Sequence, residues 1–227
     1  MIRAKNIHFS YDKLNVLNGV NLDIKKGEFV SIVGDSGAGK STLLNLIGTL
    51  ERMQLGSLTI NNKDIINLNE IELAKIRNKE IGFIFQFHNL LNEFTALENI
   101  CLPAFLNGTT KETAEKKGME LLGMLNLHHK SENKPDELSG GEQQRVAVAR
   151  SLINSPSILL ADEPSGNLDS RNASELHELL LKLNKETSQT IIVITHSKEL
   201  AKLADKTYEI KDGKIIWLKA LLSYQIV

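Results

Sequence analysis

The stretch from residue 29 to residue 47 constrains the fold most, because it joins an apolar run to a helix-like run through a glycine-rich loop. The apolar run, residues 29–33, is typical of a buried strand, and the loop that follows reads G-D-S-G-A-G-K-S-T. Its three glycines let the backbone curl so that successive N–H groups point inward at phosphate oxygens. The N-terminus of the following helix adds a positive end. The sequence therefore predicts an α/β core that binds a nucleoside triphosphate.

Two side chains at the end of this phosphate loop, residues 34–42, indicate the chemistry of the site. Lys40 would place its charge on the β- and γ-phosphates, and the Ser41 hydroxyl would be a ligand of Mg²⁺. A glycine-rich turn with no nucleotide to bind requires neither residue in this register. The loop residues expected to bind the nucleotide are Gly34, Asp35, Ser36, Gly37, Ala38, Gly39, Lys40, Ser41 and Thr42.

Composition limits which partners the chain is expected to bind and in which cell compartment it is expected to lie. The 227 residues include 27 basic and 28 acidic ones, a net charge of −1, so nothing predicts a nucleic acid as the main partner. The single cysteine, Cys101, excludes an internal disulfide and is expected to be a small buried residue. The chain opens without a signal-peptide pattern, and no apolar run approaches the ~18 residues that span a bilayer. We therefore expect a cytoplasmic protein with at most a peripheral role at a membrane.

Strand patterns appear at both ends of the chain. Apolar and polar residues alternate over residues 1–30, and residues 57–60 repeat the pattern, which predicts a half-buried antiparallel sheet. Residues 158–161 and 190–194 are short β-branched runs that are typical of a parallel sheet buried on both faces. Residues 208–216 are typical of a hairpin that turns at Asp212-Gly213.

Helical patterns dominate the middle of the chain. From residue 71 to about residue 133 the apolar residues have helical spacing, with Pro103 and Pro135 as expected breaks. A second helix is expected at residues 172–185. The apolar end of the chain, residues 215–222, is expected to pack on the core as a last strand and a short helix. In the segment from Lys111 to Leu127 one helix face would carry Ala114, Leu121, Leu122 and Leu125.

Residues 138–145, L-S-G-G-E-Q-Q-R, predict a second helix start that binds an anion. Ser139 and Glu142 have the spacing of a capping box. The adjacent Gly140 and Gly141 leave the N–H groups of the first turn uncovered, as in the phosphate loop. An ordinary capped helix is the alternative, but a phosphate loop elsewhere in the chain favours the anion site. The two helix starts could converge within one chain or across two.

The Leu-Ser-Gly-Gly-Glu run, at this distance from the phosphate loop, resembles the signature of the ATP-binding-cassette (ABC) ATPases over essentially the whole chain. The resemblance implies a P-loop NTPase core, an N-terminal antiparallel β-subdomain and an inserted helical subdomain. It implies one domain, residues 1–227, with the core at about 1–86 and 155–227 and the helical subdomain at about 87–154. It also implies a head-to-tail homodimer, in which each ATP lies between the phosphate loop of one copy and the signature of the other.

Two carboxylates follow the strand expected at residues 158–161. Asp162 and Glu163 would lie at the carboxyl end of the sheet, where open α/β folds bind their ligands. Asp162 would hold Mg²⁺ through water, and Glu163 would orient and polarise the attacking water. A pair of acids at a helix start before Pro164 is the alternative, and the phosphate loop in the same chain argues against it.

The resemblance implies roles for residues that the local pattern alone would not single out. His196 would contact the γ-phosphate, and Gln86 would touch Mg²⁺ and sense the membrane subunit. Asp169 would lie on a loop that crosses the dimer interface, and Tyr11 would stack on adenine, unless it is only a half-exposed strand tyrosine. The expected catalytic residues are Glu163, His196 and Lys40; the expected Mg²⁺ ligands are Ser41, Gln86 and, through water, Asp162; and the expected signature contacts are Ser139, Gly140, Gly141 and Glu142.

Residues 85–99 are expected to bind an integral membrane permease subunit, because they present aromatic and aliphatic side chains around Gln86. Leu90, Leu91 and Phe94 could equally belong to the core. Together with residues 166–172, this stretch is similar to the ATPase of the lipoprotein-releasing system. The similarity implies a peripheral subunit on the cytoplasmic face of the inner membrane. It would power the release of lipoproteins toward the outer membrane, and the cargo would touch only the membrane subunits.

Three residues of this chain depart from the pattern of the lipoprotein-releasing ATPase. Asn92 replaces the usual proline, Ser165 the usual threonine and Ser197 the usual aspartate, which keeps macrolide, peptide and cell-division-type ABC complexes as alternatives.

Three other classes of protein are less consistent with the sequence. An ABC ATPase that acts on DNA should carry long heptad arms, and this chain has no sustained heptads. A regulator without hydrolysis would be expected to lack Glu163 or His196. A small-molecule kinase has no reason to carry the signature. The sequence therefore predicts ATP-driven transport.

Overall fold

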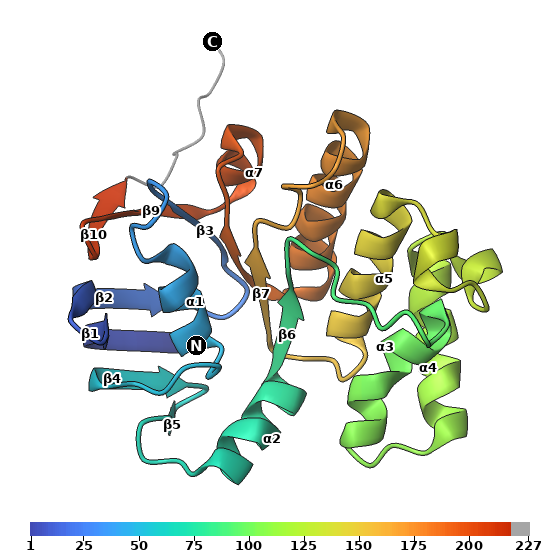
Figure 1. Cartoon of the computed structure of the whole chain (residues 1–227), viewed down its shortest axis with the longest axis horizontal. Helices are drawn as coiled ribbons and strands as arrows, with labels where there is room; N and C mark the ends of the chain where they lie inside the picture. The colour runs from blue at the N-terminus through green and yellow to red at the C-terminus, as the bar shows by residue number, and fades with distance from the viewer. Residues whose placement is uncertain (219–227) are drawn as a thin grey trace. The chain divides into compact units, whose positions relative to one another are not determined.

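Two units make up residues 1–218, the part of the chain that the computed structural model describes. The first unit contains Met1–Leu73 and the chain from Leu180 onward, and the second contains Ala74–Leu179. Along the chain the elements are β1 (Ile2–Tyr11), β2 (Leu14–Ile24), β3 (Phe29–Val33), α1 (Lys40–Ile47), β4 (Leu55–Ile60), β5 (Lys63–Asp64), α2 (Glu70–Glu80), β6 (Ile81–Ile84), α3 (Ala96–Leu106), α4 (Lys111–Met124), two short 3₁₀ helices (His128–Lys130 and Pro135–Glu137), α5 (Gly140–Leu152), β7 (Ile158–Asp162), α6 (Ser170–Thr187), β8 (Thr190–Ile194), α7 (Lys198–Leu203), β9 (Lys206–Lys211) and β10 (Lys214–Leu218) (Figure 1).

An antiparallel sheet in the first unit confirms the prediction from residues 1–30 and 57–60. β1 pairs with β2 on one side and with β4 on the other, in the order β2-β1-β4-β5. Ile2 lies opposite both Ile24 and Ile60, and all three side chains are buried. Because alternate side chains of a strand share a face, this register gathers the apolar positions on one side of the sheet.

The strand that leads into the phosphate loop, β3, is buried between two parallel neighbours in the first unit. Phe29 pairs with Ile191 of β8, and Val33 pairs with Glu209 of β9. Every residue of β8 is buried, as predicted for residues 190–194. The β9–β10 hairpin turns at Asp212-Gly213, whose φ angles of 50° and 71° are those of a two-residue turn. The predicted parallel strand and hairpin are both confirmed.

In the second unit, β6 and β7 form a parallel pair, and β7 confirms the buried strand predicted at residues 158–161. β6 is a correction, because it lies in the stretch that was predicted to be helical. With four residues it is too short for periodicity to separate a strand from a helix. A Cβ atom on Gly82, within β6, would overlap the Ser151 carbonyl oxygen of α5. The strand and the helix therefore approach each other at backbone distance.

Helices α3, α4 and α5 pack around one apolar cluster in the second unit (Figure 1). Cys101 is fully buried there, as predicted, and burial raises the pKa of its thiol to about 11. The thiol is therefore protonated near neutral pH and behaves as an apolar side chain. The predicted face of α4 is confirmed, since the cluster contains the buried Ala114, Leu122 and Leu125 and the partly buried Leu121.

Pro103 lies inside α3, whereas the sequence predicted a break at this residue. The helix begins with a capping box at Thr95 and Glu98 and continues past the proline. Buried apolar residues on both sides of Pro103 hold the helix in place by packing. The carbonyl oxygen of Pro103 accepts hydrogen bonds from the side-chain amides of Asn78 (2.9 Å) and Asn154 (3.0 Å). Tertiary contacts thus override the local preference of proline.

The helix predicted at residues 172–185 and the last predicted strand are both present in the structure. The helix is α6, and the strand is β10. The short helix expected after it lies outside the described residues.

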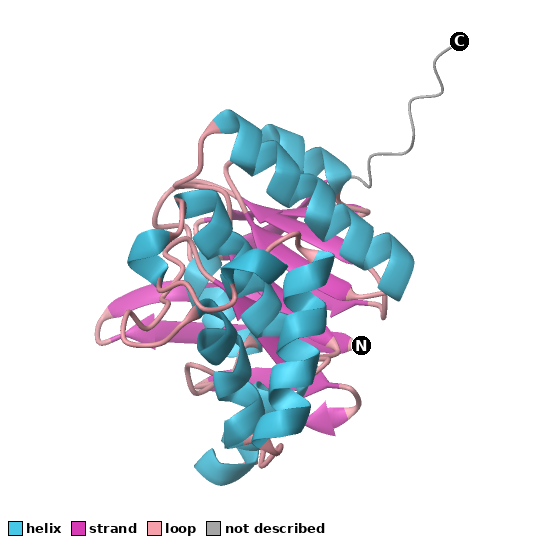
Figure 2. Ribbon diagram, turned by 90° about the vertical axis from the view of Figure 1, so that its right-hand side faces the viewer, coloured by secondary structure: helices cyan, strands magenta, loops and turns pink. Residues whose placement is uncertain are grey.

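The helices are coloured apart from the strands in Figure 2. Among residues 1–218, no helix has both the length and the apolar character to cross a membrane.

Candidate functional site

The phosphate loop, residues 34–42, is curled around the ammonium group of its own lysine. Lys40 is buried, and its Nζ donates hydrogen bonds of 2.9 Å to the carbonyl oxygens of Gly34 and Asp35. Helix α1 begins at Lys40 and has no acidic residue in its first turn. Its positive N-terminal end is therefore not neutralised from within the helix, and the loop fits the terminal phosphates of a nucleotide.

The curl requires glycine at two positions, where the backbone conformation and the neighbouring atoms leave no room for a side chain. Gly34 has φ 147° and Gly39 has φ 101°, values that L residues rarely adopt. A Cβ atom on Gly34 would overlap the carbonyl oxygen of Ile210 in β9. A Cβ atom on Gly39 would lie 2.9 Å from the carbonyl oxygen of Val16 in β2. Two strands therefore shape the loop from outside.

His196 lies beside the start of the phosphate loop in the first unit. It lies two residues after the end of β8 and two residues before the short helix α7. A cavity of about 600 Å³ is lined by His196, Gly34 and Asp35, together with residues of α7 and β9. The structure thus brings this histidine and the loop to one surface.

Tyr11 ends β1 and keeps 44% of its surface exposed. Its ring packs edge-on against Phe9, with centroids 4.9 Å apart, and its hydroxyl donates to Glu51 at 3.2 Å. A cavity of about 540 Å³ is lined by residues 35–38 of the phosphate loop, the start of β2 and the β9–β10 turn. Tyr11 is not one of its lining residues. The exposed ring can accept a stacked base, but the cavity itself does not include it.

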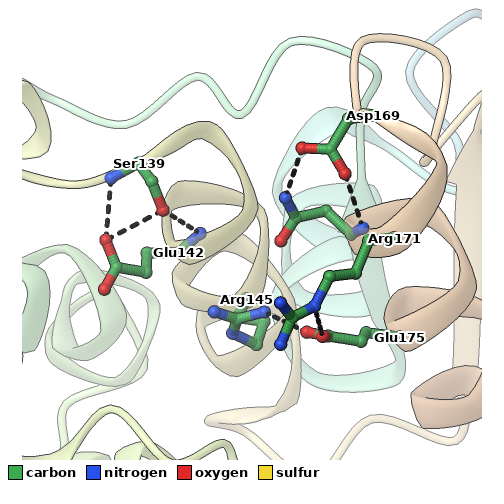
Figure 3. Close-up of polar contacts among 7 residues, drawn as sticks. Ser139, Glu142, Arg145, Asp169, Arg171 and Glu175 are labelled. Carbon is green, nitrogen blue, oxygen red and sulfur yellow. Dashed lines mark hydrogen bonds and ion pairs between the residues drawn. The ribbon is translucent and has the colours of Figure 1, made fainter.

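The signature turn, residues 138–142, forms the predicted capping box at the start of α5 (Figure 3). Ser139 N donates to Glu142 Oε2 at 2.8 Å, and Ser139 Oγ donates to the same atom at 2.9 Å. Hydrogen bonding to the Ser139 backbone is the main cause that lowers the pKa of Glu142. A Cβ atom on Gly140 would meet nothing within 4 Å, so the first turn is open on that side.

Gln86 follows β6 and Glu163 follows β7, and the loop after Glu163 contacts Gln86 within the second unit. Asp162 ends β7, and Glu163 follows with φ 45°, a strained value for this residue. Gly166 N donates to the Glu163 carbonyl oxygen at 3.0 Å. Gln86 Nε2 donates to Asn167 Oδ1 at 3.2 Å, and Asn167 Nδ2 donates back to the Gln86 carbonyl oxygen at 3.2 Å. The loop after Glu163 is therefore tied to Gln86.

Asp169 ends this loop as the acceptor at the start of α6. It accepts hydrogen bonds from Asn172 N at 2.9 Å and from Asn172 Nδ2 at 2.7 Å, and these bonds lower its pKa (Figure 3).

The contacts of α6 include two residues, Asn172 and His177, that the sequence analysis did not identify. The buried His177 contacts Ser165, with 2.9 Å between Nε2 and Oγ. The Asp-x-x-Asn spacing is a helix-cap signal that could have indicated Asn172. Nothing in the sequence indicated His177.

Helix α5 also holds the backbone of residues 85–89. Gln144 Nε2 donates to the Phe85 carbonyl oxygen at 3.3 Å. Arg150 donates to the carbonyl oxygens of His88 at 2.7 Å and Asn89 at 2.6 Å. Burial is the main cause that lowers the pKa of the His88 imidazole, and the charge of Arg150 lowers it further. The expected permease-binding segment is thus braced by the helix that carries the signature turn.

Comparison with known proteins decides the family. The sequence matches the ABC transporter family over residues 17–166. It is 50% identical over 216 residues to the lipoprotein-releasing system ATP-binding protein LolD of Bacteroides fragilis, covering 95% of this chain and 100% of that protein. The chain belongs to the ABC transporter family.

Other ABC transporter proteins agree with this assignment. LolD of Aquifex aeolicus is 48% identical over 216 residues, covering 95% of this chain and 96% of that protein. The dimeric post-hydrolysis state of the ATP-binding cassette MJ0796, bound to ADP and Pi, superposes with a TM-score of 0.89. It is 41% identical, and the match covers 99% of this chain and 100% of that one. The predicted ABC ATPase fold is confirmed.

The expected site residues of this ABC transporter chain divide between the two units. The first unit contains Tyr11, the phosphate loop and His196. The second contains Gln86, the signature turn, Asp162, Glu163 and Asp169. The division into a core and a helical subdomain at about residues 87–154 stays a prediction.

Replacing Lys40 tests the phosphate loop. We expect Lys40→Ala to weaken ATP binding by about ten- to a hundredfold, because a charge-assisted contact with phosphate is lost. Calorimetric titration of the chain with MgATP measures the change. Lys63→Ala, which removes the same charge from an exposed position on β5, should leave the affinity as it is. Equal affinities in the Lys40→Ala variant and the unchanged chain would remove Lys40 from the site.

Proposed function

We propose that this chain is the ATP-binding and ATP-hydrolysing subunit of an ABC transporter and drives its membrane partners by closing with a second copy on ATP. The observation that carries the proposal is that glycines shape two helix starts, at α1 and α5, which expose N–H groups to an anion. The solved cassette MJ0796, which is 42% identical and dimeric, supports a pair of chains. ATP would lie between the phosphate loop of one copy and the signature turn of the other.

The roles of the side chains follow from their chemistry. Mg²⁺ bound with ATP would neutralise charge on the phosphoryl oxygens. Ser41 and Gln86 would hold the ion directly, and Asp162 would hold it through water. Lys40 and His196 would bind the terminal phosphates as donors. Glu163, whose backbone is fixed by the turn to Gly166, would orient and polarise the attacking water. Tyr11 would stack on adenine.

We further propose that integral membrane permease subunits dock on residues 86–99. Phe87, Leu91 and Phe94 are exposed in this segment, and Leu90 packs against the helical core. An exposed apolar row next to Gln86 suits an amphipathic helix of a partner. Because α5 holds residues 85–89 through Gln144 and Arg150, a force on the segment would reach the signature turn.

The transported cargo is proposed from the relatives. Relatives that are 43–50% identical over nearly the whole chain carry the name of the lipoprotein-releasing system. We infer that this chain, as a peripheral subunit on the cytoplasmic face of the inner membrane, powers the release of lipoproteins toward the outer membrane. The lipoprotein would contact the membrane subunits and not this chain.

Glu163→Gln tests the proposed function. The amide cannot take a proton from water, so we expect turnover to fall by about a thousandfold while ATP binding remains and the variant dimerises. In vesicles that contain the native membrane partners, the unchanged chain should release a labelled lipoprotein with ATP, and the variant should not. Turnover near the unchanged level would exclude Glu163 as the catalytic carboxylate. Absence of release by the unchanged, hydrolysing chain would exclude the lipoprotein cargo alone.

Phe87→Asp tests the docking surface. Phe87 is 69% exposed, so a charge there is expected to disrupt an apolar contact without cost to the fold. We expect the variant to lose co-purification with the membrane subunits. Ile71→Asp is the matched control, because Ile71 is also 69% exposed but lies on α2. The proposal for this segment fails if both variants bind the membrane subunits equally well.

A further inference from the structure

The side chain of Asn172 joins two loops that the proposed function uses separately. Its amide nitrogen Nδ2 donates to Asp169 Oδ2 at 2.7 Å, and its backbone N donates to Asp169 Oδ1 at 2.9 Å (Figure 3). On its other side, the same side chain lies against Gly141 of the signature turn. A Cβ atom on Gly141 would overlap Asn172 Oδ1 and lie 2.6 Å from Asn172 Cγ.

The chemistry of an amide suits this position. The Asp169 carboxylate accepts two hydrogen bonds and needs a donor, which Nδ2 supplies. An aspartate of the same shape at position 172 would place two carboxylates together. The absence of a side chain on Gly141 gives the amide oxygen its space. Gly141 is therefore required by packing within this chain, apart from any contact it makes with a nucleotide.

A second link between α5 and α6 lies nearby and is made by charged groups. Arg145 of α5 and Glu175 of α6 form an ion pair at 3.2 Å, and Glu175 also pairs with Arg171 at 3.0 Å (Figure 3). The pair of Arg171 with Glu175 lies within α6, and because the Arg171 side chain is 88% exposed, this pair contributes little. The half-buried Asn172, in contrast, contacts Asp169 and the signature turn themselves.

We propose that Asn172 is a positioning residue of the composite ATP site, which sets the place of Asp169 relative to the signature turn of the same chain. The inference rests on the proposed function, in which the signature turn and the Asp169 loop both face a second copy. When the signature turn of one chain closes on ATP, Asn172 carries the placement to Asp169. Each closed site then fixes the loop that crosses the dimer interface.

The test measures ATP turnover in the purified complex of this chain with its membrane partners. We expect Asn172→Ala to lower kcat about tenfold and to leave KM for MgATP within about twofold, because the phosphate loop is untouched. Asn172→Asp keeps the shape and should lower kcat at least as much. Arg171→Ala, the neighbouring control, should keep the unchanged kcat.

A double-variant cycle separates positioning from a general loss of stability. If Asn172 acts through Asp169, the combined variant Asp169→Ala with Asn172→Ala should have the kcat of Asp169→Ala alone. Multiplied losses, or an unchanged kcat in Asn172→Ala, would overturn the inference. Either result leaves the proposed function intact as long as the unchanged complex hydrolyses ATP. An unchanged complex without turnover would contradict the proposed function, and this inference with it.

Discussion

The exposed N–H groups at the start of α1 are the feature on which the rest of the structure depends. They can face an anion only because the backbone before them curls through Gly34 and Gly39. The curl in turn depends on two strands, since Gly34 packs on β9 and Gly39 packs on β2. The register of β3 with β9 and the position of the antiparallel sheet therefore determine the shape of the phosphate loop. The packing of the first unit therefore sets the conformation of the phosphate loop.

In the second unit, the feature on which the other contacts depend is helix α5. Its first residues form the signature turn, and Gly141 contacts Asn172 of α6. Its later residues Gln144 and Arg150 hold the carbonyl oxygens of residues 85–89. One helix thus links the signature turn, the Asp169 loop and the proposed docking segment. A rigid helix transmits a displacement along its length, which suits a subunit that couples nucleotide binding to a membrane partner.

Most of the architecture could be predicted because the sequence patterns are local. Alternation identified β1, β2 and β4, and the spacing of Ser139 and Glu142 identified the capping box. Failures occurred where tertiary packing decides: β6 is four residues long and contains Gly82, and Pro103 continues α3 because buried neighbours hold it. The contact of Asn172 with Gly141 and that of His177 with Ser165 join distant residues. No local pattern predicts such pairs, although Asn172 left a capping signal.

The most direct test of the account mixes two defective chains, both hydrolysis-blocked by Glu163→Gln. One carries Lys40→Ala in the phosphate loop, and the other carries Gly140→Asp in the signature turn. If each ATP lies between the phosphate loop of one copy and the signature turn of another, the mixture contains one intact site per pair. Native mass spectrometry of differently tagged chains with MgATP should then show mixed dimers, and neither chain alone should dimerise. A mixture of folded chains that stays monomeric, while the Glu163→Gln parent dimerises, would contradict the account.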